Sequence, residues 1–211
     1  MSSHETGSYI IAVAGTSGAG KTAVTKATAE SLDGAFCVHF DDYATVSSYP
    51  QDMRGWLDAG ADPDAWHTPR LGDDLRALNA GSAIDAPNGD RIEPGSFIVL
   101  EEPFGRARPD VADSIDFVAL VDVPMEVALA RRLLRDLDGE APRQPDGYAR
   151  RVYGFLSSYV DVYRDAYIAG VRLARESCDI EVDGLRSVEE IAEEIAMAAR
   201  VARRVSEHSQ T

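Results

Sequence analysis

The residues with the clearest capacity for chemistry form a short glycine-rich stretch near the N-terminus. In order they are Gly15, Thr16, Ser17, Gly18, Ala19, Gly20, Lys21 and Thr22, which fit the phosphate-binding pattern Gly-x-x-x-x-Gly-Lys-[Ser/Thr]. Glycines at these positions let successive backbone N–H groups point toward phosphate oxygens at the positive end of a helix. The Lys21 ammonium would reach the β- and γ-phosphates of a nucleoside triphosphate, and the Thr22 hydroxyl would bind Mg²⁺.

The segments on either side of this loop fit a phosphate-binding role. The apolar run Tyr9–Ala14 precedes it with the composition of a buried parallel strand, and the helix-forming segment Ala23–Leu32 follows it. The plainer alternative is a glycine-rich turn that only joins a strand to a helix. Because the motif and its context agree, we predict a nucleotide-binding P-loop here.

Two adjacent carboxylates follow the next segment with strand composition. Asp41 and Asp42 come directly after Ala35–Phe40. Acidic residues at the carboxyl end of a strand point into the crevice where ligands of open α/β sheets bind. One carboxylate could accept a proton from a substrate hydroxyl while the other held Mg²⁺ through water. Solvated surface charges or a helix cap are the alternatives.

Two later strand segments raise the question of which acid serves a metal ion. Phe97–Leu100 is followed by Glu101, and Phe117–Val121 is followed by Asp122. Each has the form of a buried strand that ends in a carboxylate, which is the Walker B pattern. The strand pattern alone does not distinguish the two acids.

A cluster of arginines lies on one side of a predicted helix. Arg131, Arg132 and Arg135 precede the loop-like segment 138–147. Such runs are usually solvated and charge-paired. In a chain this acidic, the cluster also fits a phosphate clamp on a mobile lid of about residues 131–150.

The remaining segments complete the order of elements. Residues 44–69 have the composition of a loop and contain Trp56 and Trp66, either of which could cover a small core or stack on a substrate ring. Further predicted elements are a helix over Leu71–Ala80, an Asn-Gly hairpin within Ala83–Ile92, one or two helices over Tyr148–Ala174, a strand over Asp179–Gly184, and a helix capped by Ser187 and Glu190 that ends near Val205. This order predicts an α/β fold, with a parallel sheet and helices on both of its faces.

Composition narrows the class of partner. The chain has 211 residues, of which 21 are basic and 36 acidic, for a net charge of −15. That charge disfavours nucleic acid and anionic membranes as partners. No apolar run approaches the length of a membrane span, and the N-terminus has no signal-peptide pattern. We expect a soluble, cytoplasmic protein that is a single domain over residues 1–211, a monomer or homodimer, with Cys37 and Cys178 as buried small hydrophobes.

Taken in order, these motifs resemble the uridine kinase, phosphoribulokinase and nicotinamide riboside kinase group of P-loop small-molecule kinases. The resemblance spans nearly the whole chain and implies the three-layer P-loop NTPase fold with a small lid. In this group the first aspartate of a segment like Phe40–Tyr43 is the candidate base, which here is Asp41, with a further role at the metal. The segment that ends in the group's strand-end glutamate matches Glu101, so Glu101 is preferred over Asp122 as a metal ligand.

The resemblance also implies which residues meet the two substrates. The lid arginines, here Arg131, Arg132 and Arg135, would touch the phosphates of ATP, with Arg131, Arg135 and Lys21 stabilising the transferred group. Asp64 looks like the aspartate that holds ribose hydroxyls. The other implied acceptor contacts are Asp42, Tyr43, Trp66 and Arg91.

Two departures from the group's pattern bear on the acceptor. Uridine kinases carry an aromatic residue and a histidine around the hairpin, where this chain has Ile84–Asp90. The glycine that follows the strand-end glutamate is Glu102 here, and Pro103 and Phe104 come next. The sequence therefore predicts a rebuilt acceptor pocket beside a retained phosphate-handling half.

The leading hypothesis is a kinase that uses ATP and Mg²⁺ to phosphorylate a hydroxyl on a small, ribose-bearing acceptor such as a nucleoside or nicotinamide riboside. The alternative is a regulatory P-loop NTPase or a nucleotide-binding protein without kinase activity. A GTPase-type switch would need an Asn-Lys-x-Asp motif, and the only lysines are Lys21 and Lys26. The choice between ATP and GTP as donor stays open, as does the identity of the acceptor.

Overall fold

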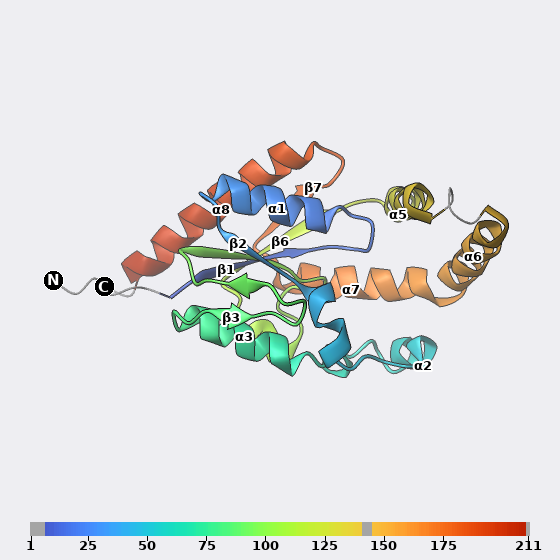
Figure 1. Ribbon diagram of the computed structural model, residues 1–211, viewed down its shortest axis with the longest axis horizontal. Helices are drawn as coiled ribbons and strands as arrows, with labels where there is room; N and C mark the ends of the chain where they lie inside the picture. The colour runs from blue at the N-terminus through green and yellow to red at the C-terminus, as the bar shows by residue number, and fades with distance from the viewer. Residues whose placement is uncertain (1–6, 141–144, 210–211) are drawn as a thin grey trace.

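The computed structural model describes residues 7–140 and 145–209, and a five-stranded parallel sheet lies at its centre (Figure 1). The strands are β1 (Tyr9–Ala14), β2 (Phe36–His39), β5 (Phe97–Glu101), β6 (Phe117–Asp122) and β7 (Ile180–Asp183). Their order across the sheet is β2-β5-β1-β6-β7. Because parallel neighbours need a crossover connection, the helices between these strands cover both faces. The predicted α/β architecture is confirmed.

Both faces of the sheet are buried, which explains why its strands read as continuous apolar runs. Side chains of β1 alternate between two hydrophobic clusters: Ile10 and Ala12 belong to one, and Ile11 and Val13 to the other. All four are completely buried. This alternation follows from the two-residue period of a strand.

Two layers of helices enclose the sheet. The helices α1 (Lys21–Ser31) and α8 (Val188–Ser209) supply side chains to the cluster on one face. The helices α3 (Pro69–Asn79), α4 (Pro109–Ala112) and α7 (Arg164–Ser177) supply the cluster on the other. Figure 1 shows α1 and α8 above the sheet and α3 and α7 below it. The result is the predicted three-layer arrangement.

The predicted lid is more helical than the sequence indicates. Helix α5 (Met125–Glu140) runs into the segment expected to be a loop, and α6 (Pro145–Ser158) resumes after it. Only the helical ends of the 138–147 segment are described, since residues 141–144 lie outside the described residues. The predicted segment 148–174 is helical in two parts, because a π-helical turn over Tyr159–Tyr163 joins α6 to α7.

The prediction of a loop over residues 44–69 is wrong in part. A 3₁₀ turn covers Phe40–Val46, helix α2 covers Met53–Asp58, and a second 3₁₀ turn covers Pro63–Ala65. Asp52 caps α2, because its Oδ1 accepts a hydrogen bond of 2.9 Å from the Gly55 backbone N–H. Elements this short have no detectable periodicity, so composition alone made the segment look irregular.

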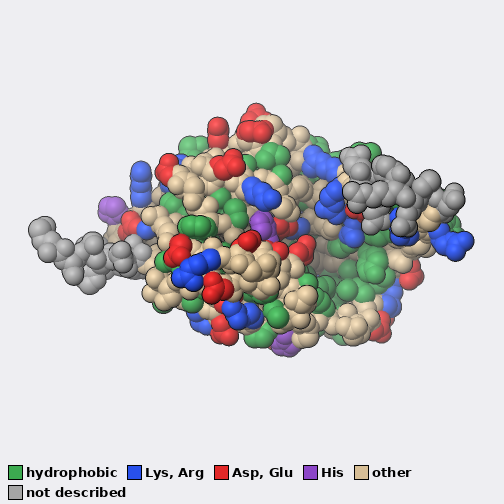
Figure 2. Space-filling view, viewed as in Figure 1, with side chains coloured by type: hydrophobic (Ala, Val, Ile, Leu, Met, Phe, Trp, Pro, Cys, Tyr) green, Lys and Arg blue, Asp and Glu red, His purple; other side chains and the backbone are tan. Residues whose placement is uncertain are grey.

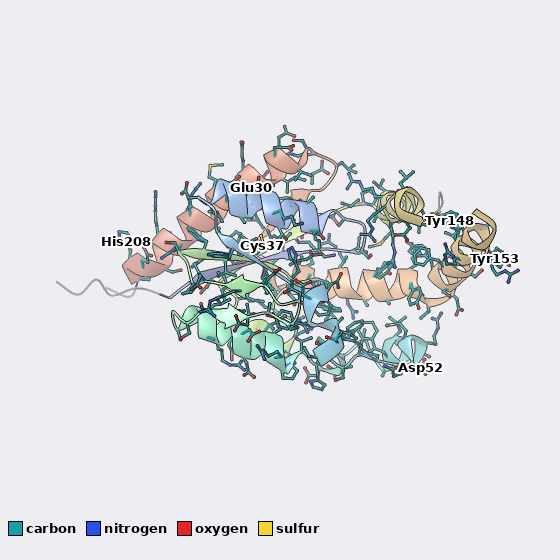
Figure 3. All side chains as sticks on the ribbon, in the orientation of Figure 1. Glu30, Cys37, Asp52, Tyr148, Tyr153 and His208 are labelled. Atoms are coloured by element: carbon teal, nitrogen blue, oxygen red, sulfur yellow. The ribbon has the colours of Figure 1, made fainter. Side chains whose placement is uncertain are left out.

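The predicted hairpin and the cysteines can be placed directly. Strand β3 (Ile84–Asp85) pairs in antiparallel fashion with β4 (Arg91–Ile92), which confirms the hairpin. Cys37, labelled in Figure 3, lies on β2, and its thiol is free, as is that of Cys178. Both are only partly buried, although each packs against a hydrophobic cluster. None of the described helices is long and apolar enough to cross a membrane.

Helix α8 provides a prediction about stability. The Ser187 Oγ accepts a hydrogen bond of 3.3 Å from the Glu190 N–H, and Glu190 Oε2 accepts one of 3.1 Å from the Ser187 N–H. This capping box confirms the predicted start of the helix. Replacing Ser187 with Ala should lower the free energy of unfolding by about 1 kcal/mol, since the Glu190 N–H loses its acceptor and the Glu190 carboxylate loses the hydroxyl that donates to it at 2.8 Å. Urea denaturation measures the change.

The matched control for this substitution is Ser206→Ala near the other end of α8. Ser206 is exposed, and its hydroxyl only donates to the Ala202 carbonyl within the helix. That variant should unfold at the same urea concentration as the unmodified protein. Equal effects at both serines would contradict the capping role of Ser187.

Candidate active site

A cavity of about 750 Å³ opens at the carboxyl ends of β1, β2 and β5. This edge is where ligands of open parallel sheets bind. Figure 2 shows a hollow on this face, with basic side chains above it and hydrophobic side chains below and beside it. The cavity is lined by every P-loop residue except Ala19, by the three arginines of α5, and by Asp41, Glu101 and Trp66. Most of the predicted site residues are therefore brought together.

The P-loop has the backbone that phosphate binding requires. Gly20 has φ of 95°, which favours glycine, and α1 begins at the next residue. A side chain at Gly18 would place its Cβ 2.1 Å from the Ala128 carbonyl oxygen of α5, so only glycine fits there. The N-terminus of α1 consequently faces the cavity with its N–H groups available for an anion.

Lys21 is a nearly buried cation at the base of this cradle. Its Nζ donates to the Thr16 carbonyl at 3.2 Å and lies 4.0 Å from Glu101 Oε1. Burial lowers the pKa of Lys21, while the carboxylates of Glu101 and Asp41 act in the opposite direction. A buried cation with few anionic contacts gains stabilisation when a phosphate group arrives.

Glu101 sits at the centre of a small polar network. Its Oε2 accepts a hydrogen bond of 2.9 Å from the Thr22 hydroxyl and lies 3.0 Å from His39 Nδ1. The three groups meet because His39 and Glu101 are register partners on adjacent strands, next to the P-loop strand. Burial would raise the pKa of Glu101, but the hydrogen bonds from His39 and Thr22 and the charge of Lys21 outweigh it and lower the pKa. Glu101 is therefore an anion inside the cavity.

The other strand-end acid lies elsewhere. Asp122 is exposed and forms an ion pair of 3.0 Å with Arg175. It does not line the cavity, whereas Glu101 does. The geometry thus favours Glu101 for any metal ion that accompanies a nucleotide.

The two adjacent aspartates after β2 have different surroundings. Asp41 is exposed and lines the same cavity as the P-loop, close enough to influence Lys21 electrostatically. Asp42 Oδ2 instead accepts a hydrogen bond of 3.0 Å from Asn88 in the hairpin. Of the two aspartates, Asp41 lines the cavity and Asp42 does not.

The arginines of α5 line the phosphate side of the cavity. Arg131 Nη1 donates to the Gly184 carbonyl at 3.0 Å and more weakly to Ala19. Arg132 Nη1 donates to the Ser17 hydroxyl at 3.0 Å, and its guanidinium lies 4.6 Å from the centre of the Phe155 ring. Arg135 is 67% exposed beside them. Helix α5 therefore presents Arg131 and Arg132 directly to the P-loop.

Aromatic side chains line much of the cavity, and one of them, Tyr167, accepts a hydrogen bond of 2.5 Å from the Arg132 Nη1 that also contacts Ser17 of the P-loop. Trp66 and Phe104, with ring centres 5.1 Å apart, form one wall. Tyr163, from the π-helical turn, and Tyr167 form another and stack at 6.3 Å. The second tryptophan, Trp56, is 6% exposed and donates to the Asp62 carbonyl, so it covers a small core. Trp66 is thus the tryptophan positioned to meet a ligand.

Several predicted acceptor contacts lie outside the cavity. Tyr43 is fully buried, and its hydroxyl donates to Asp74 at 2.9 Å. Arg91 on the hairpin forms ion pairs with Asp85 and Glu93, and Asp64 is exposed in a 3₁₀ turn. With Asp42, these residues do not line the cavity in this structure.

Ala19 also lies outside the cavity, although it belongs to the P-loop. Its side chain packs in the core, so only its backbone belongs to the phosphate cradle. In a P-loop the backbone N–H groups make the phosphate contacts, so this placement is consistent with the predicted role.

Sequence reasoning missed several residues that shape the site. His39 could have been found, since it ends β2 at the same sheet edge as the predicted acids. Phe104, Phe155, Tyr163 and Tyr167 come from segments whose approach to the P-loop is set by tertiary packing. No local pattern marks them.

The donor set at the P-loop fits Mg²⁺ bound to a nucleotide. The Thr22 hydroxyl and the Glu101 carboxylate lie side by side, and both are hard oxygen donors. Within residues 7–140 and 145–209, no group of three or more His, Cys, Asp or Glu is arranged to hold a metal ion. Mg²⁺ commonly takes only one or two protein oxygens and completes its shell with phosphates and water.

The relatives of the chain include curated uridine kinases. The protein from Deinococcus deserti is 29% identical over 187 residues, which span 82% of this chain and 86% of the relative. The one from Chloroflexus aggregans is 28% identical over 189 residues, 83% of this chain and 86% of the relative. No protein-family model matches the chain.

Solved structures support the fold. A protein described as a possible uridine kinase from Bacillus stearothermophilus has a TM-score of 0.51 at 14% identity, over 87% of this chain and 91% of that one. Shikimate kinase from Acinetobacter baumannii has a TM-score of 0.50 at 17% identity, over 90% and 92%. At these identities the likeness concerns the fold alone.

Fold and site define a nucleotide-binding protein with a P-loop kinase fold. The predicted resemblance to the uridine kinase group is confirmed by the curated relatives. With its curated relatives, the chain is a phosphotransferase with a hydroxyl group as acceptor, and its substrate is a small molecule.

Proposed function

We propose that the protein transfers the γ-phosphoryl group of ATP to a hydroxyl on a small, ribose-bearing metabolite, with Mg²⁺. The observation that carries the proposal is the cavity that Lys21 of the phosphate cradle shares with Asp41. A cation for the donor and a carboxylate for the acceptor are what this reaction needs.

Each residue has a distinct role in the proposed reaction. Asp41 orients the acceptor hydroxyl and takes its proton as the new P–O bond forms. Lys21 and the guanidinium groups of Arg131 and Arg135 stabilise the charge on the transferred group, while Arg132 holds the donor phosphates. Thr22 and Glu101 hold Mg²⁺, and the bound metal neutralises charge on the phosphate oxygens.

The acceptor side favours a substrate with a flat, uncharged or cationic ring. Its walls are Trp66, Phe104 and Tyr163, and such faces stack on planar rings. The basic residues among the cavity lining, which are Lys21, Arg131, Arg132 and Arg135, all lie on the phosphate side. An anionic acceptor would therefore lack a counter-charge. The uridine kinase names of the relatives make uridine the first nucleoside to test.

The alternative of a regulatory NTPase without an acceptor has less support. Nucleotide hydrolysis alone would not need a cavity that extends from the P-loop to an aromatic wall. Extensive lining by Trp66, Phe104 and Tyr163 instead supports a second bound molecule.

The remaining parts of the proposal concern organisation. We take residues 1–211 to act as a single domain in which about residues 131–150 move as a lid over the bound nucleotide. A monomer or homodimer located in the cytoplasm is expected.

The experiment that tests the proposal is a coupled assay of ADP release with ATP and a panel of acceptors. The panel contains uridine, cytidine, adenosine, nicotinamide riboside and, as an anionic non-ribose control, shikimate. At least one ribose-bearing compound should raise ADP release well above the rate with ATP alone, and shikimate should not. Equal rates with and without every ribose-bearing compound would overturn the proposal.

A further prediction concerns the metal. Activity should disappear when EDTA removes Mg²⁺ and return when Mg²⁺ is added. In Glu101→Gln the Mg²⁺ concentration for half-maximal activity should rise about tenfold or more, because a neutral amide binds the cation more weakly than a carboxylate. Asp122→Asn is the control, and its Mg²⁺ dependence should match that of the unmodified protein. A larger effect at Asp122 would reverse the assignment.

A further inference from the structure

A buried ion pair lies directly beneath the acceptor side of the cavity. Arg108 and Glu102 are both completely buried. Arg108 Nε donates to Glu102 Oε1 at 3.1 Å, and Nη2 donates to Glu102 Oε2 at 2.5 Å, so the guanidinium and carboxylate meet in a two-point contact. Burying two charges carries a large desolvation cost, which such a contact only partly offsets. The pair is therefore a weak source of stability.

The arginine also contacts three parts of the cavity wall. Its Nη1 donates to the Trp66 carbonyl at 3.2 Å and to the neighbouring Thr68 hydroxyl. Its guanidinium carbon lies 4.8 Å from the centre of the Phe40 ring and 5.9 Å from that of Phe104. Trp66, Phe40 and Phe104 all line the cavity.

Glu102 fixes the same wall from the other side. Its Oε1 also accepts a hydrogen bond of 3.1 Å from the Phe104 N–H. Along the chain, Glu102 follows the candidate metal ligand Glu101, and Phe40 precedes the candidate base Asp41. One ion pair thus connects the ends of β2 and β5 with the segment that carries Trp66.

Arg108 cannot contact a substrate directly. Four donated hydrogen bonds engage all three of its nitrogens, and its side chain has no exposed surface. Any influence on the reaction must pass through the residues that it holds.

We propose that Glu102 and Arg108 are a positioning pair that sets the aromatic acceptor wall, and thereby acceptor binding, without touching either substrate. The proposal rests on the proposed kinase function. It assigns to this pair the placement of Trp66 and Phe104, on which an acceptor ring would stack. The side-chain hydrogen bonds of the phosphate cradle involve neither Glu102 nor Arg108.

The test is the double variant Glu102→Leu/Arg108→Met, because replacing both partners of a buried pair with apolar residues usually preserves folding. Its KM for the best acceptor of the panel should rise about tenfold or more, as expected for a displaced substrate-binding wall. Its KM for ATP should stay within about twofold, since the P-loop contacts persist. A proportionate change in both KM values, or no change in either, would overturn the proposal.

The structural control is Arg106→Met. Arg106 lies two positions earlier in the same loop, pairs with Asp179 at 2.9 Å, and donates to the carbonyls of Ile115, Asp116 and Ser177, yet it does not line the cavity or contact its aromatic wall. That variant should melt at a lower temperature with both KM values unchanged. An acceptor KM raised as much by Arg106→Met as by the double variant would show a merely structural effect and contradict the assignment.

A readout independent of turnover separates this proposal from the kinase function. The indole N–H resonances of Trp66 and Trp56 are recorded by NMR in the absence of substrates. The double variant should move the Trp66 resonance more than that of Trp56, and Arg106→Met should move neither strongly. An unmoved Trp66 resonance would overturn the positioning role even if the kinase function holds. Should the double variant fail to fold, Glu102→Gln, which keeps an acceptor oxygen for Arg108, should show the same pattern with smaller changes.

Discussion

Replacing Lys21 with Met is expected to lower kcat/KM for phosphoryl transfer by about a thousandfold, because the variant loses a cation that acts on the transferred group in a site of low dielectric. Lys21 is almost buried, and its closest contacts are a backbone carbonyl at 3.2 Å and Glu101 at 4.0 Å. No arginine in the cavity occupies the same position, so none can substitute for it. Steady-state kinetics with ATP and the best acceptor measure the loss.

The chain offers an unusually close control for that experiment. Lys26 is its only other lysine, and it is exposed on α1 outside the cavity. Lys26→Met removes the same charge and should leave kcat/KM within about twofold, as most surface substitutions do. Comparable losses at both lysines would mean that overall charge, and not the phosphate cradle, determines the rate.

Replacing Asp41 with Asn is expected to lower kcat by about a thousandfold, the middle of the range for loss of a general base. The amide can still accept a hydrogen bond from the acceptor hydroxyl but cannot take its proton. Binding of Mg·ADP, measured by isothermal titration calorimetry, should change little, because the P-loop contacts do not involve Asp41.

The adjacent residue provides the matched control. Asp42→Asn makes the same chemical change one position along the chain, in a side chain held by Asn88 outside the cavity. Its kcat should remain within about threefold of the unmodified value, as for a residue without contact to substrate. Unchanged turnover in Asp41→Asn, or a larger loss in Asp42→Asn, would sink the assignment of Asp41 as base.

The phosphate half of the site could be predicted because its information is local. The residue types of Gly15–Thr22 define the backbone conformation of the loop. The motif also requires an apolar strand before the loop and a helix after it. Glu101 and Asp41 could be added because carboxyl ends of parallel strands meet at one edge. His39 and Glu101 illustrate this, because they are paired on adjacent parallel strands and both lie at that edge.

The acceptor half could not be predicted because its contacts depend on tertiary packing. Tyr43 directly follows Asp41 and Asp42 in the sequence. Its hydroxyl nevertheless donates a hydrogen bond to Asp74 on α3, within the core. Arg91 is engaged by acids of its own hairpin and its flank. Short-range sequence patterns contain no information about which partner a long polar side chain will reach.

Arg108 is the clearest example of a residue whose surroundings could not be predicted from the sequence. A charged residue between an arginine-rich loop and a proline is expected to be exposed. It is instead completely buried, since Glu102 is six positions earlier and a turn brings the two together. The glutamate was visible in the sequence as a departure from the expected glycine, but its partner was not.

The central claim is that one cavity joins a nucleotide donor to a hydroxyl acceptor. Mass spectrometry of the acceptor after incubation with ATP and Mg²⁺ tests it most directly. The account predicts that a ribose-bearing acceptor gains a single phosphoryl group, with one ADP formed for each product, and that Asp41→Asn nearly abolishes this product. Release of ADP and free phosphate with an unmodified acceptor, at a rate that the acceptor does not alter, would contradict it.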